Sequence, residues 1–215
     1  TIIGAITGKA LDDILSRYPG VSFALAGEAE ERSESMGALV STAMLALLII
    51  YALLAIPLKS YLQPIVIMSV IPFGAVGAIL GHLLLGMPLV FFSLLGIVAL
   101  SGVVVNASLV LVDCINKHRA TGESIMWAVS HAGSVRFRPI VLTSITTFVG
   151  LIPIISDKTI STQIFTPMAV SLAFGVLLGT VVTLFLVPCF YLVLEDLKAF
   201  IDRFRTVDED PAPQQ

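Results

Sequence analysis

Five long apolar stretches constrain this chain more than any other feature of its sequence. A helix needs about 20 consecutive, mostly apolar residues to cross the hydrocarbon core of a bilayer. Charged residues make up only 13 % of the chain, whereas soluble domains carry about 25 %. We therefore expect an all-α membrane fold, a bundle of five transmembrane helices. The predicted spans are residues 38–56, 64–85, 89–112, 137–155 and 165–194.

Residues 1–36 differ from this apolar remainder. Acidic residues outnumber basic ones there, and apolar side chains recur at helical spacing up to a break at Tyr18, Pro19 and Gly20. Residues 21–26 then alternate like a short strand. Because one helix and one strand cannot bury a core alone, we expect this segment to be a short α/β remnant. It would be the end of a soluble domain that lies upstream in a longer polypeptide.

Lysine and arginine predict the orientation of the predicted bundle, because they collect on the cytoplasmic side of membrane proteins. Most of the 12 basic residues follow the first or third span or lie in the C-terminal tail. The N-terminal segment should therefore lie outside the cytoplasm, with residues 197–215 forming a cytoplasmic tail whose acidic, proline-containing end is disordered. The inner residues are Lys59, Lys117, Arg119, Arg136, Arg138, Lys198, Arg203 and Arg205.

Two pairs of glycines predict where helices approach one another closely. Gly77 and Gly81 lie in the second span, and Gly175 and Gly179 in the fifth, each pair one helical turn apart. Helices in lipid associate through such small residues, because the burial of apolar side chains does not drive helix association in a bilayer. Incidental glycines, which are common in membrane helices, are the alternative interpretation.

The polar connection between spans three and four favours a separate interfacial helix. Residues 122–129 carry Trp127, the only tryptophan of the chain, and this side chain suits the headgroup region. Gly133 would end this helix, and Ser134 would then serve as the N-cap of span four.

A polar constellation crosses spans three and four. Asn106 lies seven residues before Asp113, and Thr143 lies seven residues after Arg136, which is about 10 Å along a helix in each case. The two spans run in opposite directions. If Asp113 and Arg136 both mark the inner boundary and the spans face each other, Asn106 and Thr143 lie at the same depth. Thr147 lies one turn further along the face of Arg136 and Thr143.

These residue types suit the charge-balancing part of a proton relay. Arginine stays protonated, so Arg136 can balance a carboxylate that titrates, while Asn106 and Thr143 hydrogen-bond to that group or to water. No acid lies in the interior of a predicted span, so the titrating partner must come from the rest of a longer polypeptide. The alternatives are that Asn106 only joins neighbouring helices, that Arg136 and Arg138 anchor the helix at the headgroups, and that His82 is a packed imidazole.

Other function classes find little support in the sequence. The net charge of −3 is too small to indicate nucleic acid as a partner. Cys114 and Cys189 are isolated, with neither disulfide nor metal spacing, and the methionines form no pairs for a soft metal. We expect no enzyme activity, since no nucleophile–base pair is present, and no cofactor beyond the proton as coupling ion.

Several collinear motifs resemble the C-terminal part of resistance-nodulation-division (RND) exporters of the AcrB-like class. Residues 99–106 and 108–113 are similar to the tenth transmembrane helix of that family, and residues 136–140 with Thr143 and Ser144 to the eleventh. The other matching motifs are residues 51–64, at the junction of the eighth and ninth helices, residues 150–153, and residues 187–188 with 191–192 near the end of the twelfth.

The resemblance implies a proton-driven efflux transporter that exports drugs or other amphiphiles across the bacterial inner membrane. It implies a homotrimer in the lipid bilayer, with a periplasmic adaptor and an outer-membrane channel as partners, and residues 1–36 would close the periplasmic porter domain. Arg136 and Thr143 would match the relay arginine and threonine. Asn106 stands where many members carry lysine, and Ala107 stands where the asparagine-bearing branch usually carries aspartate.

The acidic half of that relay, on the fourth helix of the family, would lie in the remainder of the same polypeptide. We therefore expect this part alone to be inactive. Two alternatives remain: a non-transporting helical scaffold or assembly module, and an RND relative that moves lipids or metals. Apolar substitution of Asn106 or Thr143 separates the first from a pump, since only a pump would lose export while its assembly persists.

Overall fold

The computed structural model describes the backbone of residues 28–207 and the side chains of residues 34–198 and 200. The expected α/β segment therefore lies mostly outside the described residues, as does the predicted disordered end of the tail. The chain divides into two units, residues 1–41 and 42–215. Of the first unit only the beginning of α3 is described, whereas the rest of α3 and all later helices belong to the second.

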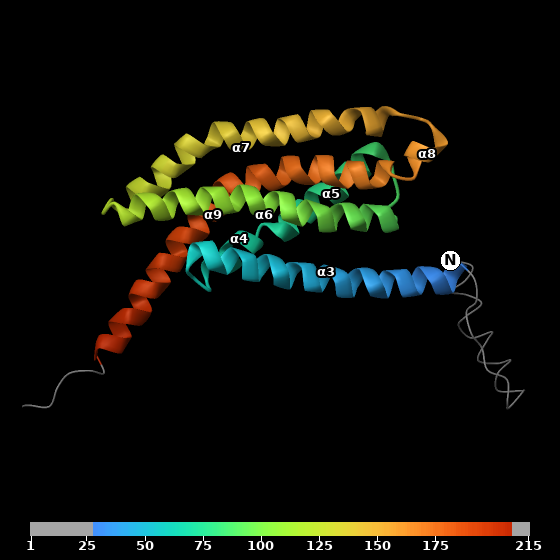
Figure 1. Ribbon diagram of the computed structural model, residues 1–215. Helices are drawn as coiled ribbons and strands as arrows, with labels where there is room; N and C mark the ends of the chain where they lie inside the picture. Colours follow the sequence, from blue (N-terminus) through green and yellow to red (C-terminus); the bar gives the residue numbers. More distant parts are fainter. Residues whose placement is uncertain (1–27, 208–215) are drawn as a thin grey trace, which may run out of the picture. The chain divides into compact units, whose positions relative to one another are not determined.

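The described residues form helices joined by short turns, with no strand among residues 28–207. An all-helical membrane fold is thus confirmed for this part of the chain. The helices are α3 (Glu28–Leu58), α4 (Gln63–Met68), α5 (Ile71–Leu85), α6 (Phe91–Ala120), α7 (Ile125–Ser156), α8 (Ile160–Gln163) and α9 (Thr166–Val207) (Figure 1).

Five helical segments are long and apolar enough to cross a membrane, as the sequence predicts. The second consists of α4 and α5 in succession, with a break at Ser69 and Val70 just before Pro72. Proline lacks the amide N–H that would continue the helical hydrogen bonds, which accounts for a break here. The five segments are Glu34–Leu58, Gln63–Leu85, Phe91–Ala120, Ile125–Ser156 and Thr166–Lys198.

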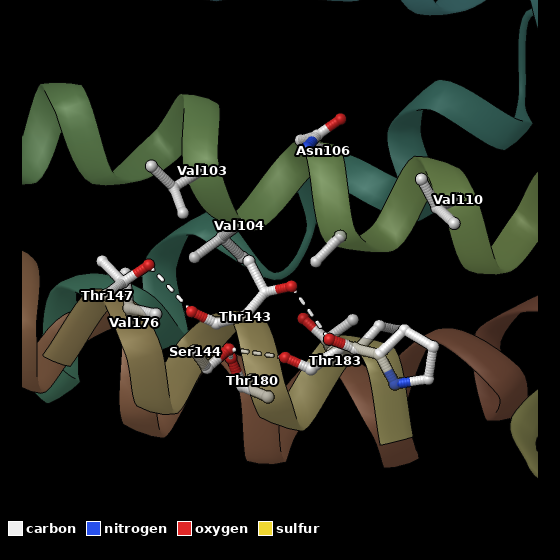
Figure 2. A pocket seen from close by; sticks show the side chains of 13 residues that line it. Val103, Val104, Asn106, Val110, Thr143, Ser144, Thr147, Val176, Thr180 and Thr183 are labelled. Atoms are coloured by element: carbon white, nitrogen blue, oxygen red, sulfur yellow. Dashed lines mark hydrogen bonds between the residues drawn. The ribbon is translucent and has the colours of Figure 1, made fainter. Parts of the chain in front are cut away.

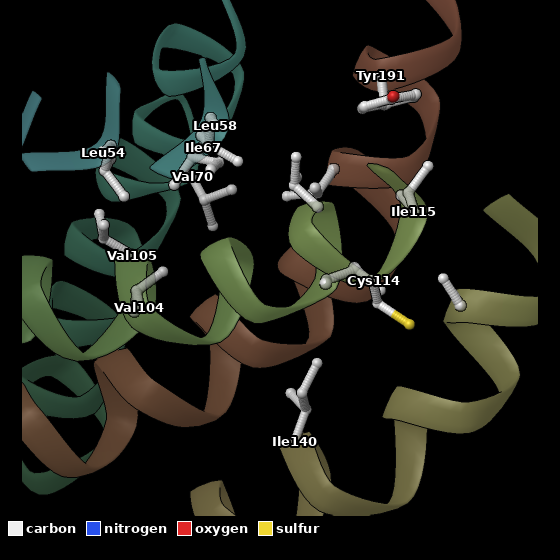
Figure 3. Packing of buried hydrophobic residues seen from close by; sticks show 14 of the residues in the cluster. Leu54, Leu58, Ile67, Val70, Val104, Val105, Cys114, Ile115, Ile140 and Tyr191 are labelled. Carbon is white, nitrogen blue, oxygen red and sulfur yellow. The ribbon is translucent and has the colours of Figure 1, made fainter. Parts of the chain in front are cut away.

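The long helix α9 is the central element of residues 42–215. The helices α5, α6 and α7 all pack along it, and α6 also packs against α7 (Figure 1). A buried cluster joins the end of α3 and α4 to α6, where Leu54, Ile67 and Val105 lie close together (Figure 3). Since lipid is as apolar as these side chains, close packing rather than removal from water holds such a cluster.

The helix α7 corrects one prediction. It runs without interruption from Ile125 to Ser156, so the predictions of a separate interfacial helix and of an N-cap at Ser134 are wrong. The cap is Ser124, whose side chain accepts a hydrogen bond from the Trp127 amide at 3.4 Å. Ser134 instead donates its hydroxyl to the Ser130 carbonyl, 3.0 Å away and one turn back. A hydroxyl satisfied inside the helix leaves no reason for the backbone to break.

Candidate functional site

A pocket opens between α6, α7 and α9, at mid-length of three apolar helices (Figure 2). Its volume is about 140 Å³. Asn106 of α6 and Thr143 and Thr147 of α7 all line it, so three residues from the predicted constellation border one pocket, although 37 positions separate Asn106 from Thr143 in the chain. Its polar lining residues are Asn106, Thr143, Ser144, Thr147, Thr180 and Thr183.

Thr143 is the centre of a short chain of hydroxyl bonds on α7. Its hydroxyl donates to the Pro139 carbonyl at 2.9 Å, and its own carbonyl accepts from the hydroxyls of Thr146 and Thr147, each at 2.9 Å. A hydroxyl that donates once still has lone pairs free to accept. Thr143 is exposed within this chain, so its oxygen can accept a hydrogen bond from a group outside the described residues.

Asn106 does not join neighbouring helices among the described residues, which was the alternative interpretation of it. Its amide makes no hydrogen bond to any residue that the structure describes, and in Figure 2 it points away from the Ser144–Thr180 pair. Asn106 is also exposed. It therefore joins no two described helices, and its two donors and its acceptor are available at the rim of the pocket.

The floor of the pocket includes two residues that the sequence did not single out, Thr180 and Thr183. Ser144 of α7 shares a short hydrogen bond with Thr180 of α9 (Figure 2), and Ser108 of α6 lies 3.4 Å from the hydroxyl of Thr183. All four side chains are buried. The only sequence signal was the spacing of Thr180 and Thr183, three residues apart in an apolar span. That spacing does not say which helix they face.

Arg136 lies on α7 two turns from Thr143 and is not among the pocket-lining residues. It is half-buried, and its Nε is buried without a hydrogen-bond partner among the described residues. An unpaired buried donor on a charged group costs about 1–3 kcal/mol or more. The arrangement is therefore incomplete until an acceptor reaches this nitrogen. Arg138, by contrast, is exposed.

The four predicted glycines all lie where α5 crosses α9. A Cβ atom on Gly77 would lie 2.8 Å from the Phe174 carbonyl oxygen and 3.1 Å from the Gly175 Cα, and one on Gly81 would meet the Phe174 side chain. Gly175 and Gly179 approach Gly74 and the α6 side chains Leu100 and Val104 in the same way. The backbones of α5 and α9 thus approach each other closely at these glycines.

His82 has a structural environment. It is 1 % exposed, and its Nδ1 lies 2.9 Å from the Ala78 carbonyl, to which only an N–H can donate. In the neutral ring, Nε2 then accepts from the Ser93 hydroxyl at 2.8 Å. Ser171 of α9 donates to the Ser93 carbonyl at 2.9 Å, so these bonds join α5, α6 and α9 at one end of the bundle.

Comparison with known proteins adds two findings. The model of the AcrB/AcrD/AcrF family matches residues 5–195. Two crystal forms of a heavy metal efflux pump share the fold, with TM-scores of 0.73 and 0.72 at 24 % sequence identity. These matches cover 90 % and 88 % of this chain. The chain spans only about a fifth of the length of those pumps, 19 % and 20 %.

Proposed function

Because this chain belongs to the AcrB/AcrD/AcrF family of RND efflux transporters, we propose that it supplies the basic and hydrogen-bonding half of a proton relay in a drug–proton antiporter. The observation that carries the proposal is the pocket where Asn106 and Thr143 meet. Polar groups in an apolar span are costly and mark ion or proton pathways. Here they gather between helices rather than scattering over the lipid-facing surface.

Each residue has a distinct role in this proposal. Arg136 supplies a permanent positive charge, and its unpaired Nε accommodates a carboxylate from the rest of the polypeptide. When that carboxylate takes up a proton, its attraction to Arg136 weakens, and Thr143 and Asn106 hydrogen-bond to the protonated form or to water. The described part of this chain places no acid in the pocket lining. The titrating group therefore belongs to the remainder of the protein.

The cargo we propose is a drug or another amphiphile rather than a metal. The structural likeness to a heavy metal efflux pump, at 24 % identity, extends to the fold alone. Within the described residues no three potential metal ligands gather. We further propose transport without enzymatic turnover, in a trimer of the bacterial inner membrane that works with a periplasmic adaptor and an outer-membrane channel. The C-terminus would be cytoplasmic.

The test is a set of substitutions in the intact transporter: Thr143→Val, Asn106→Leu and Arg136→Ala, with Thr146→Val as the matched control. Thr146 lies on the same helix and is exposed, but it does not line the pocket. Removing a hydrogen bond between neutral groups costs about 0.5–1.5 kcal/mol. Proton-coupled export in proteoliposomes should therefore fall about two- to tenfold for Thr143→Val, while Thr146→Val stays near wild type.

Drug susceptibility of cells, measured at matched expression and with trimer assembly checked, gives the second measurement. We expect Arg136→Ala to abolish resistance while the assembled protein persists. Wild-type resistance in Arg136→Ala would remove this arginine from the mechanism. Normal export with apolar residues at both Asn106 and Thr143 would favour a helical scaffold instead.

A further inference from the structure

A second hollow, unrelated to the relay pocket, lies at one end of the bundle. The turn after α3, the first turn of α4, the C-terminal part of α6 and α9 enclose about 420 Å³. Three lysines from three separate segments line it, Lys59, Lys117 and Lys198. We call this hollow, with its three lysines, the lysine hollow.

The charges around the lysine hollow do not cancel. Lys117 pairs with Asp113 at 2.7 Å, and Glu195 pairs with both Lys198, at 2.6 Å, and Arg119. Lys59 has no ion-pair partner among the described residues. Three lysines and one carboxylate, Asp113, thus line the hollow. Glu195, outside the lining, is shared between Lys198 and Arg119, so an excess positive charge is left for an anion to neutralise.

The backbone of Lys59 carries an independent sign of a constrained site. Its φ is +49°, the one positive φ found at a non-glycine residue in the described part of the chain. Residues with a Cβ atom are disfavoured in this left-handed region, which glycine adopts readily. Such outliers cluster at ligand clamps. A lysine at a position that suits glycine marks this turn as a candidate ligand-binding segment.

The floor of the lysine hollow is rigid. Gln63 and Asn116 exchange two amide hydrogen bonds of 3.1 and 2.9 Å, and the Tyr191 hydroxyl donates to the Asn116 side chain at 2.8 Å. These bonds connect α4, α6 and α9. A site whose walls are already in place loses little entropy when a ligand binds.

An apolar groove adjoins the lysine hollow and shares Lys59 and Ser60 with it. This groove, of about 340 Å³, is completed by Ala55, Ile56 and Tyr61. Ile56 is 74 % and Tyr61 79 % exposed, although both are bulky. The Tyr51 hydroxyl donates to the Tyr61 carbonyl at 2.9 Å, which holds the turn beside the groove. A charged hollow and an apolar groove thus meet at Lys59.

We propose that the lysine hollow and its groove bind one anionic phospholipid of the surrounding leaflet. The phosphate lies among Lys59, Lys117 and Lys198, and an acyl chain follows Ile56 and Tyr61. Lysine is a common phosphate ligand, and basic pockets at the ends of membrane helices bind anionic headgroups. The apolar groove favours a lipid over a free phosphate ion, because an ion would leave that groove unfilled. The proposal is independent of proton coupling.

The test is native mass spectrometry of the intact, delipidated polypeptide in a neutral detergent. The probes are phosphatidylglycerol and phosphatidylcholine with identical acyl chains, and inorganic phosphate as a competitor. We expect phosphatidylglycerol to bind more tightly than phosphatidylcholine. One lysine near an anionic headgroup is worth about a fivefold change in affinity. The substitution Lys59→Gln should therefore weaken the binding of phosphatidylglycerol by that factor. Lys59→Arg should retain binding, and Lys158→Gln, which removes a lysine outside the hollow, should change nothing.

Lys59→Gly separates binding from folding. This variant relieves the backbone strain, so its melting temperature in detergent should equal or exceed that of wild type. Its affinity for phosphatidylglycerol should nevertheless fall as it does in Lys59→Gln. Retained binding in Lys59→Gly would show that Lys59 serves only the turn. Equal affinity for the two lipids, or full displacement by inorganic phosphate at concentrations comparable to that of the lipid, would also overturn the proposal.

Discussion

Replacing Gly77 by alanine should destabilise the crossing of α5 and α9 by about 2 kcal/mol. The added Cβ would lie 2.7 Å from the Leu178 Cβ, 2.8 Å from the Phe174 carbonyl oxygen and 3.1 Å from the Gly175 Cα. These are backbone atoms or the first atom of a side chain, so no rotamer change can clear the space. The two helices would have to separate instead.

The magnitude follows from two opposing effects. Overpacking a close contact costs about 1–3 kcal/mol, with the upper part expected here because the contacting atoms cannot turn away. A gap of about 1 Å between the helices would also forfeit up to about half of the dispersion energy of each affected contact. Alanine in a helix gains about 1 kcal/mol over glycine. The net loss is therefore about 2 kcal/mol.

The assay is reversible unfolding of the intact protein in mixed micelles, with Gly133→Ala as the matched control. Gly133 lies inside α7, and a Cβ there would have no heavy atom within 4 Å. The control should therefore gain up to about 1 kcal/mol from helix propensity alone. If Gly77→Ala is as stable as Gly133→Ala, the glycines are incidental and the argument from close approach fails.

Two further predictions concern polar groups. Asn116→Leu should cost about 1–3 kcal/mol in the same unfolding assay, because the Gln63 amide and the Tyr191 hydroxyl lose their buried partner; an unchanged stability would contradict this. Hydrogen bonds from the backbone amide and then the hydroxyl of Thr159 lower the pKa of Asp157 below its usual 3.8. These bonds should persist at neutral pH and be lost as the pH falls through that lowered value, so the protection factor of the Thr159 amide against hydrogen exchange should fall only in strong acid. A protection factor that already falls between pH 7 and pH 5 would refute the assignment.

Much of the fold followed from hydropathy because the bilayer leaves few choices. Within hydrocarbon every backbone N–H and C=O must find a partner inside the segment, so an apolar run of membrane length becomes a helix. Hydropathy marks where a helix leaves the membrane, however, and not where it ends. For this reason α6 continues past the expected residue 112 to Ala120, and α7 begins at Ile125 rather than near residue 137.

The candidate site, too, could be predicted only in part from the sequence. The depth of Asn106 and Thr143 could be calculated from the sequence, because a helix rises by a constant 1.5 Å per residue. The rotation of each helix could not be predicted, since apolar residues surround these helices on every side and no polar stripe identifies the outer face. Thr180 and Thr183 were therefore missed, although both lie in a predicted span.

The sequence by itself determined that the described part of this chain holds five segments long and apolar enough to cross a membrane, and which residues could lie at one depth. Both properties depend on composition and distance along a single helix. Only the tertiary structure decided that α9 is central and that Thr180 and Thr183 complete the pocket. It also decided that Arg136 lies outside the pocket lining, with a buried Nε that has no partner among the described residues. These features depend on contacts between segments far apart in the chain, where glycines such as Gly77 set how closely two backbones approach.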